Sequence, residues 1–292
     1  MANLINGQTR VCGIFGDPVA HSFSPAMHNA AFAALGLNWV YLPFLVAPAY
    51  LAAAVAGIRA LGLAGVNVTI PHKQGILPFL DELTEEARLI GAVNTVHNRE
   101  GRLYGANTDA DGFLAALQEE TGFQPAGKSV LLIGAGGAAR AVAVKLALSG
   151  VGELYLTNRS PERAENLAAL LKEHSKARIQ VLDWPADAGA TLPLKPDLTV
   201  QTTPAEMSTS AKAAGWLPAA VWGPGQVVCD LVYNPAETPL MRRAKASGAT
   251  VRGGLGMLLR QGALAFQLWT GQPAPLAVMK QALLKSIGRG AG

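Results

Sequence analysis

Cysteine is scarce in this chain of 292 residues, which contains only Cys12 and Cys229. Both lie in apolar, strand-like runs, so the sequence argues against a disulfide framework or a cysteine-based zinc site and indicates a reducing compartment. Charged residues make up only 15% of the chain, and its 24 basic and 20 acidic residues are scattered along it. A nucleic-acid groove needs a clustered basic stripe, so we expect no nucleic-acid partner. The net charge of +4 fits small anionic ligands.

Long apolar runs are also missing. The most extended one, residues 51–66, is interrupted by Arg59 and by glycines before it could span a bilayer. The first ten residues lack the basic-then-apolar pattern of a signal peptide. We therefore expect no membrane partner, no bound metal and a cytoplasmic location. Half of the residues are hydrophobic and the mean hydropathy is +0.24, which predicts a large core divided between two domains.

Apolar runs alternate with helical patterns over the first hundred residues. Ser24 is expected to be the N-cap of a helix that has Pro25 in its first turn. Strands separated by helices of this length predict right-handed crossovers and a mostly parallel sheet. The letters NREG at 98–101 predict a hairpin added to that sheet. Strands are expected over 10–16, over 39–46 and from residue 64, and helices over 24–36, 48–62 and 109–122.

A second alternating unit begins near residue 128, and the last forty residues predict two helices that return to the first domain. The fold class is therefore α/β with two domains, the first with a mostly parallel sheet. The expected boundaries are 1–109 for the first domain, 110–255 for the second domain and 256–292 for the C-terminal helices.

The clearest motif is VLLIGAGGAAR, residues 130–140, where an apolar strand leads into the spacing G-x-G-x-x-A before an alanine-rich helix. Gly134 permits a tight turn, Gly136 lets backbone N–H groups approach a pyrophosphate, and Ala139 allows close helix–strand packing. Tight turns alone also collect glycines, but the strand before and the helix after favour a dinucleotide. The cofactor-binding residues expected here are Gly134, Ala135, Gly136, Gly137 and Ala138.

The next strand ends at NRSPER, residues 158–163, about twenty residues beyond the fingerprint. An NAD enzyme presents an acidic residue to the ribose at this strand tip, and the tip has none. Two guanidinium groups and a hydroxyl suit the 2′-phosphate of NADP. The alternative is a helix N-terminus with surface arginines. The expected NADP-binding residues are Asn158, Arg159, Ser160 and Arg163.

Eight motifs are spread over nearly the whole chain: HSFSPAMHN (21–29), NVTIPHK (67–73), GAVNT (91–95), GANTD (105–109), GAGGAAR (134–140), NRSPER (158–163), DLVYNP (230–235) and GLGMLLRQGALAF (254–266). Their order and approximate spacing resemble the shikimate dehydrogenase family. The resemblance implies an enzyme that interconverts 3-dehydroshikimate and shikimate with NADP, in the shikimate pathway of aromatic amino acid biosynthesis. It also implies that residues 1–109 are an α/β substrate-binding and catalytic domain and that residues 110–255 are a Rossmann-type NADP-binding domain.

The resemblance also implies site residues. Lys73 and Asp109 fall on the catalytic pair, and Ser22 and Ser24 on the pair that binds the substrate carboxylate. Further substrate contacts are implied for Thr69, Asn94, Asp109, Tyr233 and Gln261, and further cofactor contacts for Leu231, Gly254 and, by a looser match, Glu85.

The residue chemistry agrees independently with a ring acid that carries several hydroxyls. Serines can donate to a carboxylate, and amides such as that of Asn67 can bind ring hydroxyls. Asn67 and Thr69 are expected on one face of a strand, beside Lys73 as the proton-transfer group. Other interpretations stay open: Ser22 and Ser24 as loop and N-cap residues, and Lys73 as a partner of Asp109 that closes a strand end.

Four positions depart from the family pattern, one of which is Ser160 in place of the commoner threonine, a change that keeps the hydroxyl. Gln201 and Glu206 stand where the family usually has asparagine and glycine, and Gly262 where it has alanine. Two alternative functions remain: a quinate/shikimate dehydrogenase with broader substrate or NAD use, and a non-catalytic NADPH-binding sensor. The expected partners are small molecules, and the chain is expected to be a monomer or a homodimer.

Overall fold

The computed structural model describes residues 5–185, 192–204 and 220–289. The chain divides into two units, residues 1–112 with 259–292 and residues 113–258. The predicted boundaries followed residues 109 and 255, whereas these divisions fall inside two helices, α5 (Thr108–Thr121) and α9 (Leu255–Thr270). Among the described residues, no helix has both the length and the apolar character needed to cross a membrane.

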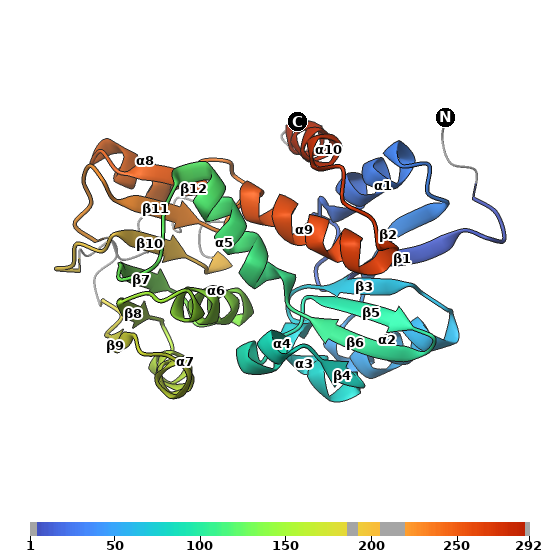
Figure 1. Cartoon of the computed structure of the whole chain (residues 1–292), viewed down its shortest axis with the longest axis horizontal. Helices are drawn as coiled ribbons and strands as arrows, with labels where there is room; N and C mark the ends of the chain where they lie inside the picture. The colour runs from blue at the N-terminus through green and yellow to red at the C-terminus, as the bar shows by residue number, and fades with distance from the viewer. Residues whose placement is uncertain (1–4, 186–191, 205–219, 290–292) are drawn as a thin grey trace. The chain divides into compact units, whose positions relative to one another are not determined.

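The first unit contains a six-stranded sheet in the order β2-β1-β3-β5-β6-β4 (Figure 1). Strand β1 pairs in parallel with β2 and β3, while β5 pairs antiparallel with β3 and β6. The predicted hairpin at NREG is confirmed: Glu100 and Gly101 both have positive φ, as a two-residue type I′ turn requires. The strands are β1 (Arg10–Gly16), β2 (Trp39–Leu45), β3 (Gly65–Val68), β4 (Glu82–Leu83), β5 (Thr95–Arg99) and β6 (Arg102–Ala106).

Both faces of this sheet are covered. Val66 and Val68 of β3 join one apolar cluster with Val55 and Ile58 of α2. The alternate residues of β3 point to the other face, where Trp269 of α9 donates from its Nε1 to the carbonyl of Val96 at 3.0 Å. The helices of this unit are α1 (Ser24–Ala34), η1 (Pro48–Tyr50), α2 (Leu51–Ala60), α3 (His72–Gly75), η2 (Leu77–Phe79), α4 (Glu85–Ile90) and α10 (Leu276–Arg289).

The predicted N-cap of α1 is wrong by one residue. Phe23 already has helical backbone angles and is the N-cap, so Ser24 is the first helical residue and its side chain makes no capping bond. The backbone N–H of Ser24 instead donates to Ser22 Oγ at 3.3 Å. Pro25 lies in the first turn, as predicted.

The second unit is a parallel sheet in the order β12-β11-β10-β7-β8-β9 (Figure 1). From β7 the chain winds outward to β8 and β9, then returns to β10 on the other side of β7, which is the doubly wound order of a Rossmann domain. The elements are β7 (Ser129–Ile133), α6 (Gly137–Leu148), β8 (Glu153–Thr157), α7 (Pro161–His174), β9 (Arg178–Leu182), β10 (Leu198–Gln201), β11 (Val227–Asp230), α8 (Pro239–Ala246) and β12 (Thr250–Gly253). The two-domain α/β class is therefore confirmed.

Candidate active site

Lys73 and Asp109 meet in the first unit, where Nζ of Lys73 lies 2.6 Å from Oδ2 of Asp109. Their side chains are 17% and 7% exposed, so the pair is largely shielded but open on one side. Lys73 does not end a strand, because β3 stops at Val68 and Lys73 lies on the short helix α3. The carbonyl of Lys73 accepts from the backbone N–H of Val93 at 2.8 Å, which fixes α3 against the segment that precedes β5.

Asn107 positions Asp109, and the sequence analysis did not identify it. Asn107 Oδ1 accepts from the backbone N–H groups of Asp109 and Ala110, at 3.1 and 3.3 Å, at the start of α5. Its Nδ2 donates to the carbonyl of Ala92 at 3.0 Å. An asparagine directly before an acidic first turn is an N-terminal helix signal, so the letters NTD could have revealed this role.

Asn94 and Gln261 form a buried amide pair next to α5. The backbone N–H of Thr108 donates to Asn94 Oδ1 at 2.7 Å, which fixes the orientation of that amide. Asn94 Nδ2 therefore faces Thr108 Oγ1 at 3.0 Å and Gln261 Oε1 at 3.4 Å. Gln261 thus accepts from Asn94 through its amide oxygen, and the two amides are held together inside the first unit.

Asn67 is used mainly inside the protein. Its Nδ2 donates to the carbonyl of Asn94 at 3.2 Å and to Thr95 Oγ1 at 3.0 Å, and its Oδ1 accepts from the Tyr41 hydroxyl at 2.8 Å. Both N–H groups are thus committed, and an oxygen lone pair is what remains for a ligand. Tyr41 and Thr95 had no local sequence signal, because they reach Asn67 across strands.

Ser22 and Ser24 lie at the start of α1, with Ser24 buried and Ser22 half-buried. Burial raises the pKa of the Tyr41 phenol well above its ordinary value. A side-chain hydrogen bond with Ser24 acts in the opposite direction and lowers this pKa. Strand β3 ends at Val68, one residue before Thr69. Asn67 and Thr69 therefore do not share a strand face, contrary to the prediction from the sequence. The carbonyl of Thr69 accepts from the His72 N–H at 2.8 Å.

In the second unit, the glycine fingerprint has the backbone geometry that a dinucleotide site needs. Gly134 has a φ of +117°, and its N–H donates to the carbonyl of Thr157 at 2.8 Å. A β-carbon at Gly136 would meet no atom within 4 Å, so the backbone at the N-terminus of α6 is open to an approaching group. Ala139 is fully buried, as close helix–strand packing requires. The fingerprint residues therefore fit a pyrophosphate.

NRSPER joins the tip of β8 to the start of α7. Asn158 Nδ2 donates to the carbonyl of Ser160 at 2.9 Å, which closes the turn. Arg159, Ser160 and Arg163 are exposed around the first turn of α7, where the helix dipole also favours an anion.

The remaining predicted cofactor residues are in different surroundings. Leu231 and Gly254 are neighbours in the second unit, since any β-carbon at Gly254 would collide with the carbonyl of Leu231. Tyr233 comes shortly after Leu231 in the sequence. Burial raises the pKa of its phenol. Glu85 is exposed in the first turn of α4 in the first unit. Glu206 lies outside the described residues.

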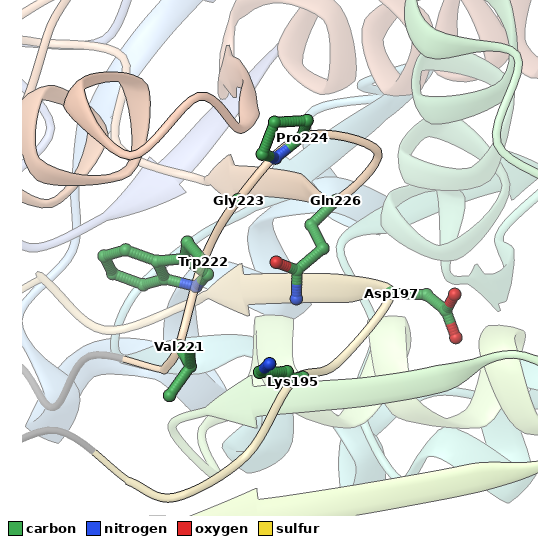
Figure 2. A pocket seen from close by; sticks show the side chains of 7 residues that line it. All are labelled: Lys195, Asp197, Val221, Trp222, Gly223, Pro224 and Gln226. Carbon is green, nitrogen blue, oxygen red and sulfur yellow. The ribbon is translucent and has the colours of Figure 1, made fainter.

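A pocket of about 390 Å³ lies elsewhere in the second unit, as Figure 2 shows. Lys195 and Asp197 precede β10 and Gln226 precedes β11, so the pocket lies at the amino ends of these strands. Asp197 accepts from Ser129, and Gln226 donates to the carbonyl of Pro196 at 2.6 Å. Dinucleotides bind at the carboxyl ends of such strands, so this pocket is separate from the fingerprint.

Comparison with known proteins matches three family models along the chain. Residues 14–96 match the shikimate dehydrogenase substrate binding domain, residues 116–185 match shikimate / quinate 5-dehydrogenase, and residues 254–284 match the shikimate 5'-dehydrogenase C-terminal domain.

Individual relatives cover nearly the full length. A shikimate dehydrogenase (NADP(+)) of Desulforamulus reducens is 54% identical over 98% of both chains. The solved shikimate 5-dehydrogenase of Thermus thermophilus, in complex with NADP(H) and shikimate, is 38% identical, with a TM-score of 0.80 over 95% of this chain and 100% of that one. A 5-ketofructose reductase of a Gluconobacter strain is 37% identical, with a TM-score of 0.85 over 96% and 99% of the two chains.

Proposed function

The chain belongs to the shikimate dehydrogenase family, and on that premise we propose that it is an NADP-dependent enzyme that interconverts 3-dehydroshikimate and shikimate. The observation that carries the proposal is the Lys73–Asp109 pair, whose charged atoms lie 2.6 Å apart. Asp109 directly follows Thr108, which is hydrogen-bonded to the buried amide of Asn94. Such an ion pair can supply a proton beside groups that bind ring hydroxyls.

Bound NADPH would supply the hydride that reduces the substrate carbonyl. Reduction leaves negative charge on the carbonyl oxygen, and the Lys73 ammonium is the group that would stabilise this charge and donate the proton. Asp109 orients the ammonium. In the oxidative direction, neutral Lys73 would take the proton from the substrate hydroxyl. Asn94 and Gln261 would line the position of the ring hydroxyls, with Asn67, Thr69 and Tyr233 as further contacts.

Cofactor binding is assigned to the second unit. The backbone N–H groups at 134–138 would hold the pyrophosphate. The 2′-phosphate would be held by Arg159 and Arg163, together with Asn158 and Ser160. The nicotinamide would lie beside Leu231 and Gly254. Glu85, which belongs to the first unit, is a further proposed cofactor contact. We further propose a cytoplasmic enzyme, either a monomer or a homodimer.

The test is the change in absorbance of the nicotinamide on mixing the protein with shikimate and NADP. Quinate and NAD are tested in parallel, because the family model also names quinate. Faster turnover with quinate would favour the broader alternative, and NADP binding without turnover would favour a sensor. The neutral 5-ketofructose, named for the Gluconobacter relative, tests whether a carboxylate is required.

We predict that replacing both Ser22 and Ser24 by alanine raises the Michaelis constant for shikimate by about tenfold or more, because charge-assisted hydrogen bonds to the carboxylate are lost. NADP binding should not change. The double replacement also removes the bond from the Ser24 N–H to Ser22 Oγ and the bond between Ser24 and Tyr41, so the melting temperature is measured in parallel. The control Thr84→Ala removes a true cap, a 3.2 Å bond from the Ala87 N–H. Shikimate affinity that stays constant while the melting temperature falls would instead support a structural role for the serines.

We predict that Arg159→Ala raises the Michaelis constant for NADP by about tenfold, with little change for NAD, because the guanidinium pairs with the 2′-phosphate. Steady-state kinetics with each cofactor checks this. The control Arg178→Ala removes another exposed arginine of the same unit, which pairs with Glu153. Equal use of NAD and NADP by the unmutated protein would contradict the prediction.

A further inference from the structure

The carboxyl ends of β7 and β10 form the switch point of the second sheet. These strands are adjacent in the sheet (Figure 1). They are parallel, and their register places Ile133 opposite Gln201. The chain leaves β7 toward β8 and β9 on one side, and β10 begins the other half of the sheet. Ligands of open α/β sheets bind where the winding reverses. The residues that follow β10 therefore face the glycine fingerprint across the place where a dinucleotide binds.

The Gln201 side chain closes a ring with the backbone two residues later. Its Oε1 accepts from the N–H of Thr203, and its Nε2 donates to the carbonyl of Thr203 at 2.7 Å. The residue is fully buried. Both peptide groups of Thr203 are thus held by one side chain, and the amide orientation is fixed by them.

The turn held in this way contacts the fingerprint directly. Thr202 bonds to the carbonyl of Ile133 twice, from its N–H at 2.9 Å and from its Oγ1 at 2.8 Å. A β-carbon at Gly134 would collide with Thr202 Oγ1 and approach Thr203 Cγ2 to 3.0 Å. On the other side, the carbonyl of Gln201 accepts from the N–H of Leu231 at 2.9 Å. Gln201 thus lies between two segments assigned to the cofactor.

We propose that Gln201 is a positioning residue for the cofactor: it holds residues 202 and 203 as the wall opposite Gly134. This inference rests on the proposed NADP-dependent function. It also gives a reason for the departure from the family's usual asparagine. Asparagine accepts the N–H two residues later in an Asx-turn, whereas the longer glutamine reaches both the N–H and the carbonyl of Thr203. The extra hydrogen bond compensates for the longer side chain.

The experiment compares Gln201→Leu, Gln201→Asn and a matched control, Thr199→Val. Thr199 is equally buried on the same strand, and its Oγ1 accepts from Trp222 Nε1 at 3.1 Å, near the pocket at the amino ends. NADP dissociation constants are measured by titrating each protein with the cofactor in the absence of substrate and following the nicotinamide signal. Michaelis constants for shikimate and melting temperatures are measured in parallel.

Gln201→Leu should weaken NADP binding about tenfold, while the Michaelis constant for shikimate changes less than about twofold. Gln201→Asn keeps one hydrogen bond and should weaken NADP binding only about two- to threefold. Thr199→Val should lower the melting temperature without changing NADP affinity.

Two results would overturn the inference: an unchanged NADP dissociation constant in Gln201→Leu, or an equal loss of affinity in Thr199→Val. Turnover of the unmutated protein with shikimate tests the proposed function separately. An unmutated protein that binds NADP but does not oxidise shikimate would therefore disprove that function and leave the positioning test decisive.

Discussion

Replacing Lys73 by alanine should lower the turnover number with shikimate by about 10²–10⁴-fold, with a smaller change in the Michaelis constant. The ammonium is the only group assigned to proton transfer, and its loss removes both the proton donor and the stabilisation of charge on the carbonyl oxygen. NADP binding should stay normal, because the fingerprint lies in the other unit. Steady-state kinetics and a cofactor titration on the same preparation check the prediction.

The matched control is Lys128→Ala. Lys128 also pairs with an aspartate, Asp197, at 3.3 Å, but this ion pair is more exposed than the Lys73–Asp109 pair and belongs to the second unit. Its loss should change neither turnover nor folding stability by much. If Lys73 merely paired with Asp109 to hold local structure, Lys73→Ala would lower the melting temperature and leave turnover within about threefold of the parent. That outcome would exclude the catalytic role.

The elements with strong local signals could be predicted from the sequence. Strand β1 covers the residues expected from its apolar run, and the NREG turn pairs β5 with β6 as expected. The fingerprint glycines also have the expected geometry, because a positive φ at Gly134 is a local requirement. Periodicity and turn chemistry act over a few residues, so they can be read without tertiary information.

The parts that depend on tertiary contacts could not be predicted. The apolar run from residue 64 predicted a strand with Asn67 and Thr69 on one face and Lys73 at its end, but β3 stops at Val68 and Lys73 lies on α3. Ser24 has the chemistry of an N-cap, yet its side chain bonds to Tyr41 of a neighbouring strand. Asn67 is likewise held by Tyr41 and Thr95. No spacing rule reports such partners.

His28 is a further case, because its surroundings come from distant parts of the chain. The ring is fully buried and stacks on Tyr41, with ring centres 4.5 Å apart and planes 7° from parallel. Trp269, Phe266 and Phe32 surround it at centre distances of 5.4 to 6.4 Å. Neither ring nitrogen has a hydrogen-bond partner among the described residues. The imidazole is therefore an uncharged aromatic core residue.

Burial lowers the pKa of His28 from its ordinary 6.5 to about 3. Below pH 6.5 the unfolded chain binds a proton at this site, while the folded protein does not until the pH approaches 3. The unfolded state is therefore stabilised increasingly as the pH falls through this window, and the folded protein loses stability. At about pH 4 the loss from this one residue should be about 3 kcal/mol, which is more than about a hundredfold change in the folding equilibrium.

The free energy of unfolding of the parent should therefore fall between about pH 7 and pH 4 by about 3 kcal/mol more than that of His28→Phe. Phenylalanine keeps the stacking on Tyr41 and cannot take up a proton. His28→Leu serves as a second variant if the larger ring disturbs packing, and His174→Gln removes an exposed histidine as the control. Urea denaturation at both pH values gives, for the parent and each of the three variants, the change in the free energy of unfolding between the two pH values. The other ionisable groups contribute equally to parent and variant, so the comparison isolates residue 28. An equal loss of stability in the parent and His28→Phe would mean that the folded protein accepts the proton at this site, and that water or a polar group reaches the ring.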